Sequence, residues 1–282
     1  MKKAYYLLIA TVLTTLSACS SSDEPAITTD KKINLTTSIE KEAIVKSPVL
    51  DETGKGQFSN GDTFTLLVAN SEGKYNNFDF TVGATELYWK NVNIANSSNV
   101  SFAACYPKQE VVDGKFTFNL SKTSDKDLLL ALTTGVATES ENPVNLSFKH
   151  AMHNLKVVFT ADSDIDADAI LTKCTAKSSC EVNLLDGSLN TAGSATADFT
   201  EKGKEVNFLI IPQATADVTL EVTAGNASKT ISIASLKPEL TELKSGMQLR
   251  VELTVKNGKI EIGNITIEGW ENQGTIGGEI IL

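Results

Sequence analysis

The chain has 282 residues, 41% of them hydrophobic, and a formal net charge of −10 at pH 7. This length predicts about two domains, and the apolar content is sufficient for packed cores. Arg250 is the only arginine and the lysines form no cluster, so the sequence lacks the basic surface that binding to nucleic acid requires.

The N-terminal residues are typical of a secretory signal peptide. Lys2 and Lys3 precede an apolar run over residues 5–16, which is too short to span a bilayer. Leu-Ser-Ala-Cys (16–19) resembles the bacterial lipobox, at which the cysteine is acylated and the chain is cut before it. We therefore predict a lipoprotein signal peptide over residues 1–18 and lipidation of Cys19. An ordinary signal peptide with a chance cysteine is the alternative.

Residues 19–32 are rich in Ser, Thr and charged residues, a composition that predicts a flexible linker. Asp23 and Glu24 resemble the acidic signal that sends Bacteroidetes lipoproteins to the outer face of the outer membrane. No later segment is long and apolar enough to cross a bilayer. We expect acyl chains on Cys19 to anchor the protein in outer-membrane lipid, because each buried methylene contributes roughly 0.8 kcal/mol.

From residue 33 onwards the pattern predicts strands and turns. Turn signals occur at Asn60-Gly61, Asp113-Gly114, Asp186-Gly187 and Asn257-Gly258, and the last predicts a β-hairpin with a type I′ turn. Strands separated by such turns predict β-sandwiches. Runs of apolar, β-branched and aromatic residues place these strands at residues 63–69, 99–107, 114–120, 155–161, 205–212, 218–224, 229–235, 247–255 and 258–270.

A polar interruption ending in proline, Gly-Val-Ala-Thr-Glu-Ser-Glu-Asn-Pro (135–143), separates two apolar stretches. We place a domain boundary there, which gives an N-terminal β-sandwich over residues 33–141 and a C-terminal β-sandwich over residues 142–282. The predicted fold class is all-β.

Three cysteines follow Cys19 in a compartment that permits disulfides. Cys174 and Cys180 flank a five-residue turn, a hairpin spacing at which cross-strand cysteines could meet. They are therefore candidates for a disulfide, with free thiols as the alternative. Cys105 lies in an apolar strand and is interpreted as a buried thiol without a partner, and no zinc-type spacing is present.

The sequence contains no visible catalytic, cofactor or metal site. The acids of Asp-Ser-Asp-Ile-Asp-Ala-Asp (162–168) lack the glycine and glutamate of a calcium loop, so a solvated turn is the better interpretation. His150 and His153 are the only histidines, and no third ligand lies nearby, which favours structural roles. No nucleophile motif or phosphate-binding glycine loop occurs, so we predict that the protein is not an enzyme.

Tyr88 and Trp89 are candidate glycan contacts, because exposed aromatic rings can stack on sugars. A buried position in a sandwich core is the alternative, and it is slightly favoured for Tyr88 and Trp89 and more strongly favoured for Trp270. Trp270 follows an alternating strand, which directs such a side chain into the core.

Several segments resemble the fimbrillin-like family of the Bacteroidetes. Gly-Asp-Thr-Phe (61–64) opens an apolar strand, a second apolar strand ends in Tyr-Pro (106–107), and Phe148, His150 and Leu155 form a Phe-x-His-x4-Leu segment. Ile265, Ile267 and Trp270 form a late Ile-x-Ile-x-x-Trp segment. The similarity is loosely spaced and covers about residues 60–282 in order.

This resemblance implies two transthyretin-like Greek-key β-sandwich domains, export as a lipoprotein, and assembly into type V pili at the cell surface. In that scheme a protease removes the first strand, and a strand of the next subunit fills the apolar groove through backbone hydrogen bonds. Such a head-to-tail contact does not close on itself and yields a fibre. The implied partners are other pilus subunits and outer-membrane lipid, with host or bacterial surface ligands as further candidates.

One departure from the major pilins affects the expected role. Cleavage in those proteins follows an arginine early in the first domain, whereas Arg250 lies near the C-terminus here. The early basic residues are lysines, at positions 31, 32, 41, 46 and 55. This favours an anchor, tip or accessory subunit, or a surface lipoprotein that does not polymerise, over a main shaft subunit.

The final segment, Thr-Ile-Gly-Gly-Glu-Ile-Ile-Leu (275–282), predicts a short apolar strand that must pair with something. Ile276, Ile280, Ile281 and Leu282 form a candidate donor strand for a neighbouring subunit, and pairing within its own domain is the alternative. The competing functional hypothesis is a glycan-binding surface lipoprotein that uses Tyr88 and Trp89.

Overall fold

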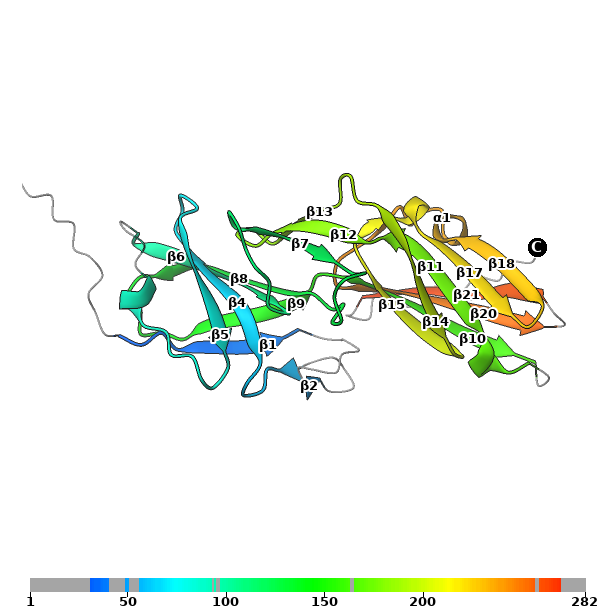
Figure 1. The fold of residues 1–282 in the computed structure, drawn as a ribbon, viewed down its shortest axis with the longest axis horizontal. Coiled ribbons are helices and arrows are strands. Elements are labelled where there is room, and N and C mark those ends of the chain that lie inside the picture. The colour runs from blue at the N-terminus through cyan, green and yellow to red at the C-terminus, as the bar shows by residue number, and fades with distance from the viewer. Residues whose placement is uncertain are drawn as a thin grey trace, which may run out of the picture.

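The computed structural model describes residues 31–40, 49–50, 56–92, 94, 97–162, 165–256 and 259–269. Nearly all the regular structure is β-sheet, arranged as two bodies that lie end to end along the long axis of the molecule (Figure 1). The first body consists of residues 31–150 without β7, and the second consists of residues 153–269 without β12 and β13. A small sheet built from both halves of the chain joins them.

The first body is one curled eight-stranded sheet with the order β2-β3-β1-β9-β8-β6-β4-β5. Among the pairings described for this sheet, β1–β9 alone is parallel. The 3₁₀ helix η1 (Trp89–Val92) precedes β6. The strands are β1 (Leu35–Ile39), β2 (Val49–Leu50), β3 (Gly56–Gln57), β4 (Thr63–Ala69), β5 (Tyr75–Thr81), β6 (Asn99–Tyr106), β8 (Leu129–Ala137) and β9 (Val144–His150).

The second body is a sandwich of two four-stranded sheets. One sheet has the order β15 (Glu205–Ile210), β10 (His153–Ala161), β20 (Met247–Lys256) and β21 (Lys259–Gly269). The other has the order β14 (Thr196–Lys202), β11 (Leu171–Lys177), β17 (Thr219–Ala224) and β18 (Ala227–Ser232). The remaining elements are η2 (Ala167–Ala169), η3 (Thr215–Asp217), α1 (Ile233–Leu236) and the two-stranded sheet of β16 (Gln213–Ala214) and β19 (Glu242–Leu243).

The joining sheet has the order β13 (Ser188–Asn190), β12 (Ser179–Asn183) and β7 (Lys115–Asn119). β7 lies between β6 and β8 in the sequence, yet it pairs along its whole length with β12. The two bodies therefore share backbone hydrogen bonds in addition to covalent connections.

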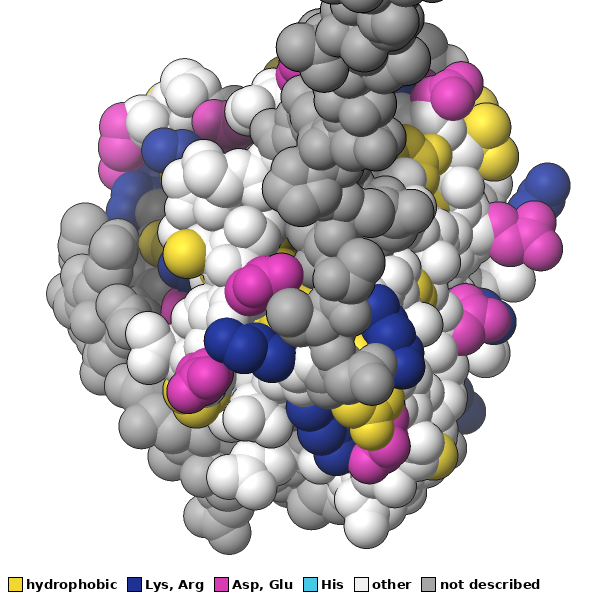
Figure 2. Space-filling view, turned by 90° about the vertical axis from the view of Figure 1, so that its left-hand side faces the viewer, with side chains coloured by type: hydrophobic (Ala, Val, Ile, Leu, Met, Phe, Trp, Pro, Cys, Tyr) yellow, Lys and Arg dark blue, Asp and Glu magenta, His cyan; other side chains and the backbone are white. Residues whose placement is uncertain are grey.

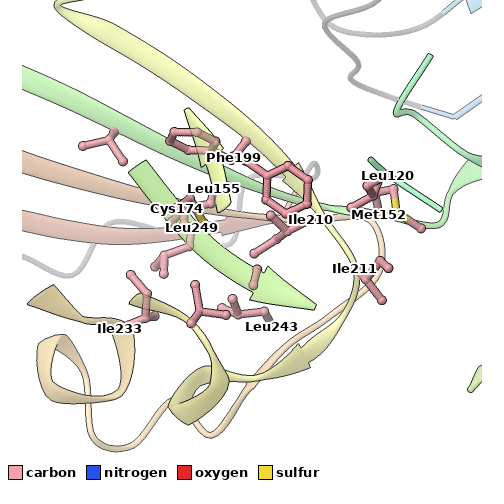
Figure 3. Packing of buried hydrophobic residues seen from close by; sticks show 14 of the residues in the cluster. Leu120, Met152, Leu155, Cys174, Phe199, Ile210, Ile211, Ile233, Leu243 and Leu249 are labelled. Carbon is pink, nitrogen blue, oxygen red and sulfur yellow. The ribbon is translucent and has the colours of Figure 1, made fainter. Parts of the chain in front are cut away.

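Two hydrophobic clusters form the cores. The first-body cluster lies inside the curled sheet, and the larger cluster fills the second sandwich and continues to the outer faces of β4 and β6, where β7 covers them. Leu66 and Val68 point to the first cluster, whereas Leu67 belongs to the second, so β4 is buried on both faces and reads as a continuous apolar run. Figure 3 shows Leu155 and Leu249 meeting Cys174 in the second sandwich.

The prediction of an all-β fold of two sandwiches is confirmed, and most predicted strands lie within a few residues of those observed. β20 and β21 form the expected hairpin, whose turn residues 257–258 lie outside the described residues. β9, which we expected at the start of the second domain, pairs with β1 and β8. The first body therefore extends to His150 rather than ending at 141, because residues 138–143 of the polar stretch connect β8 to β9 within its sheet.

Candidate functional site

The most distinctive feature of the first body is the way in which its first strand, β1, is held against β9. β1 lies parallel to β9 over five register pairs, from Leu35 opposite Val144 to Ile39 opposite Phe148. At either end, the Val144 amide donates to the Asn34 carbonyl at 2.8 Å and the Glu40 amide donates to the Phe148 carbonyl at 2.9 Å. We call the space that residues 31–40 occupy the first-strand slot.

Two isoleucines fix this segment in the core. The side chains of Ile33 and Ile39 are 4% and 3% exposed, and both belong to the first-body cluster. Below them, the ring of Phe148 lies 4.8 Å from that of Phe58 and 5.3 Å from that of Phe64, between ring centroids. Without residues 31–40 this aromatic floor would be exposed, so the slot is an apolar groove that requires a strand.

Polar contacts cover the outer face of the slot. The Ser147 hydroxyl donates to a carboxylate oxygen of Glu40 at 2.7 Å, and the Lys149 ammonium lies 3.4 Å from the other oxygen. The Lys149 and Glu40 side chains are 69% and 53% exposed, so this ion pair contributes little to stability. Apolar packing and backbone pairing therefore dominate the hold on β1.

The chain enters the slot along the segment before η1. The Ile33 amide donates to the Leu87 carbonyl at 2.8 Å, and the Trp89 amide donates to the Lys31 carbonyl at 3.0 Å. The side chain of Trp89 is completely buried and its indole N–H donates to the Ser140 carbonyl at 3.1 Å. Trp89 is thus a core residue that supports the slot, and it cannot present a face to a sugar.

Tyr88 lies beside the start of the first-strand slot, and its side chain contacts charged neighbours. Its hydroxyl donates to Glu86 at 2.8 Å, and the Lys90 ammonium lies 5.5 Å from the ring centroid. The hydrogen bond from Lys32 lowers the pKa of the Glu86 carboxyl, and the hydrogen bond to Glu86 raises the pKa of Tyr88. Figure 2 shows lysines and acids side by side at this end of the molecule rather than a patch of one charge.

Both histidines are buried where the first body meets the second. His150 ends β9, and its Nδ1–H donates to both carboxylate oxygens of Asp127, at 2.9 and 3.0 Å. His153 begins β10, its Nδ1–H donates to the Lys244 carbonyl at 3.0 Å, and burial lowers its pKa to about 4. Among the described residues no group of three or more metal-ligating side chains occurs.

A cleft between the bodies was not predicted from the sequence. It has a volume of about 700 Å³, and Leu132, 42% exposed, is its most exposed leucine. No local pattern could have revealed it, because its walls come from distant segments. They include Glu40, Leu130, Leu132, Lys149, His150, Leu184, Leu189, Ser245 and Gly246.

The proposed disulfide is not formed. Cys174 and Cys180 are free thiols, and their strands belong to different sheets: Cys174 pairs with Phe199 and Leu220, and Cys180 pairs with Phe118. Only Ser178 separates β11 from β12, so the expected hairpin turn does not exist. Cys105 is buried and free as predicted, and burial raises the pKa of all three thiols to about 12.

Several predicted features lie outside the described residues. These are the signal peptide, lipidation at Cys19, Trp270 and the candidate donor strand of Ile276, Ile280, Ile281 and Leu282. Within the described ranges no helix is long and apolar enough to cross a membrane.

The fold and the slot define a class: an all-β protein of two joined sandwiches whose first strand is held in an apolar groove. The sequence matches the fimbrillin-like family over residues 24–270, and the chain belongs to that family. No curated protein matches the sequence.

Solved structures share this fold at low sequence identity. A candidate cell adhesion protein from Bacteroides uniformis has a TM-score of 0.64 and 16% identity, covering 86% of this chain and 99% of that one. A candidate cell adhesion protein from Bacteroides ovatus has a TM-score of 0.58 and 18% identity, covering 87% and 100%. A fimbrial assembly protein from Parabacteroides distasonis has a TM-score of 0.50 and 9% identity, covering 84% and 95%.

Proposed function

We propose that this protein is a lipid-anchored, cell-surface subunit of a type V pilus that acts as an anchor, tip or accessory adhesin and has no catalytic activity. Family membership supports a place in a fimbrial system, and the lipobox supports an acylated Cys19 in the outer membrane. The first-strand slot is the observation that carries the proposal, because it is a groove that a strand of the same chain fills and another strand could replace.

The geometry of the slot supports strand exchange. Cleavage after Glu40 would free residues 31–40 to leave, which would expose Phe148 and the unpaired edge of β9. A donor strand restores the backbone hydrogen bonds with β9 and fills the two positions of Ile33 and Ile39. We assign the donor role to residues 276–282 of a neighbouring subunit, whose Ile276, Ile280, Ile281 and Leu282 supply apolar side chains.

The filled slot and the absence of an early arginine favour a terminal position in the fibre. An uncut chain keeps β1 and cannot accept a donor at this site, although it can still donate its own C-terminal strand. Lys41, Lys46 and Lys55 follow β1 in the sequence and are the sites at which a lysine-specific protease could open the slot.

Limited digestion with a lysine-specific protease tests strand exchange. We expect loss of residues 31–40 by mass spectrometry, followed by head-to-tail oligomers and filaments in electron micrographs. The matched control changes Lys41, Lys46 and Lys55 to glutamine and should remain monomeric. A second variant ends at Gly278, and it should fold and be cut but fail to polymerise. Cut protein that stays monomeric at high concentration would refute exchange, and unfolding of the Gly278 variant would refute the donor role.

Mass spectrometry of protein from cells tests the anchor separately. An N-terminal peptide with acylated Cys19 is expected, and Cys19→Ala should release the protein from the membrane fraction. A free, unacylated Cys19 would end this part of the proposal. The glycan-binding alternative is weaker, because burial of Trp89 removes one of its two proposed aromatic contacts.

A further inference from the structure

Force applied to a surface protein anchored at its N-terminus must pass through the first residues that the structure describes, which begin at Lys31. Those residues lie in the first-strand slot, where β1 and β9 are parallel and begin at the same end of the first body. The chain enters at the start of β1, far from the second body (Figure 1). After His150, only Ala151 and Met152 separate β9 from β10 of the second body.

We propose that residues 31–40 and β9 form a shear clamp that carries tension between the N-terminal anchor and the second body. This inference rests on the proposed function in one respect only, namely that the N-terminal anchor sets the direction of the applied force. A pull on the chain before Lys31 draws β1 one way, while the second body draws β9 the other way through β10. Parallel strands loaded at opposite ends slide along each other, so their cross-strand hydrogen bonds bear the load together rather than one after another.

The packing of the segment resists sliding. A shift of one residue would place inward-facing residues at outward-facing positions, and Ile33 and Ile39 would have to leave the core before β1 could move. The segment is held at both ends, by Leu87 and Trp89 before β1 and by Phe148 at Glu40. The clamp therefore includes all ten residues from Lys31 to Glu40.

The second body continues the same path. β10 lies between β15 and β20 and is parallel to β20 over eight register pairs, so load that enters at His153 spreads into the centre of a sheet. The β7–β12 pairing provides a second connection between the bodies, and it also pulls toward the second body. β9 and β7 are thus both pulled toward the second body, whereas β1 is pulled toward the N-terminal anchor.

Two pulling geometries on the same interface test the clamp by single-molecule force spectroscopy. The full chain carries Cys19→Ser, and handles are attached through introduced cysteines, since the native Cys105, Cys174 and Cys180 are buried. In the shear pair, Lys31→Cys is combined with Lys256→Cys, at the exposed end of β20. In the unzipping pair, Lys31→Cys is combined with Glu141→Cys, which lies just before β9 and beside Lys31.

We expect β1 to leave at a several-fold higher force in the shear pair than in the unzipping pair, or the second body to open before β1 leaves. The length gained at the first rupture distinguishes the two events. Adding Ile39→Ala should lower the shear force, whereas Ser38→Ala, on the outer face, should leave it unchanged. Release of β1 at equal force in both geometries would overturn the proposal. A negative result for the clamp would not refute the lipid anchor, and a negative result for the anchor would not refute the clamp, because acylation of Cys19 is measured independently of force.

Discussion

Replacing Ile39 with alanine should loosen the first strand selectively. The side chain is 3% exposed and belongs to the first-body cluster. The substitution removes three carbon atoms, each worth about 0.8 kcal/mol when buried, and leaves a cavity above the aromatic floor of the slot. The sum is about 3 kcal/mol, which corresponds to roughly a hundredfold change in the equilibrium for detachment of β1.

Hydrogen exchange measured by mass spectrometry reads this equilibrium locally. Peptides that cover residues 35–40 and 144–150 should exchange about a hundredfold faster, because their amides pair across β1 and β9. Peptides from β17 in the second body should be unchanged. Ser38→Ala is the matched control, since it removes only a weak 3.5 Å contact with Ser147. Uniform acceleration over the whole chain, or an equal effect of Ser38→Ala, would refute the view that β1 detaches as a unit.

Three further predictions concern the buried polar groups and thiols. Asp127→Ala removes both acceptors of the buried His150 Nδ1–H and should lower the free energy of unfolding by about 2–3 kcal/mol in urea titrations; a loss below 0.5 kcal/mol would contradict this. Burial lowers the pKa of His153 to about 4 from 6.5, so protonation favours the unfolded chain. Stability should be complete above about pH 6.5 and fall by on the order of 3 kcal/mol toward pH 4, and His153→Gln should reduce this slope. Cys174 and Cys180 should resist thiol reagents at pH 8 until urea unfolds the protein, and intact mass should show no bridge between them.

The local sequence pattern predicted a strand correctly where the strand itself is rich in apolar and β-branched residues or is followed by a turn motif. The run Thr-Phe-Thr-Leu-Leu-Val-Ala gave β4 with its observed bounds, and Asn257-Gly258 predicted the β20–β21 hairpin. β5 has the sequence Tyr-Asn-Asn-Phe-Asp-Phe-Thr and was missed. β5 lies at the edge of the sheet, where polar residues are tolerated. Its pairing with β4 outweighs the weak β-propensity of its asparagine and aspartate residues.

The candidate site depended on pairings that no local pattern contains. The spacing of Cys174 and Cys180 resembled a hairpin, but β11 and β12 pair with partners from other parts of the chain. The sequence favours burial of Tyr88 and Trp89 only slightly, because an aromatic pair is typical both of a packed core and of a binding surface. The slot itself joins residues 31–40 to β9, more than a hundred residues away, and only the family resemblance pointed to the importance of the first strand.

The pairing of β7 with β12 has a consequence for any attempt to divide this protein. A recombinant fragment that began at Met152 would lack Phe116 and Phe118, both of which belong to the second-body cluster, and would expose the edge of β12. Chimeras that graft one half onto a relative would therefore need to carry the 107–128 excursion together with the C-terminal half. Recombination among such genes is expected to keep these two segments together rather than to divide the chain at a single point between the two bodies.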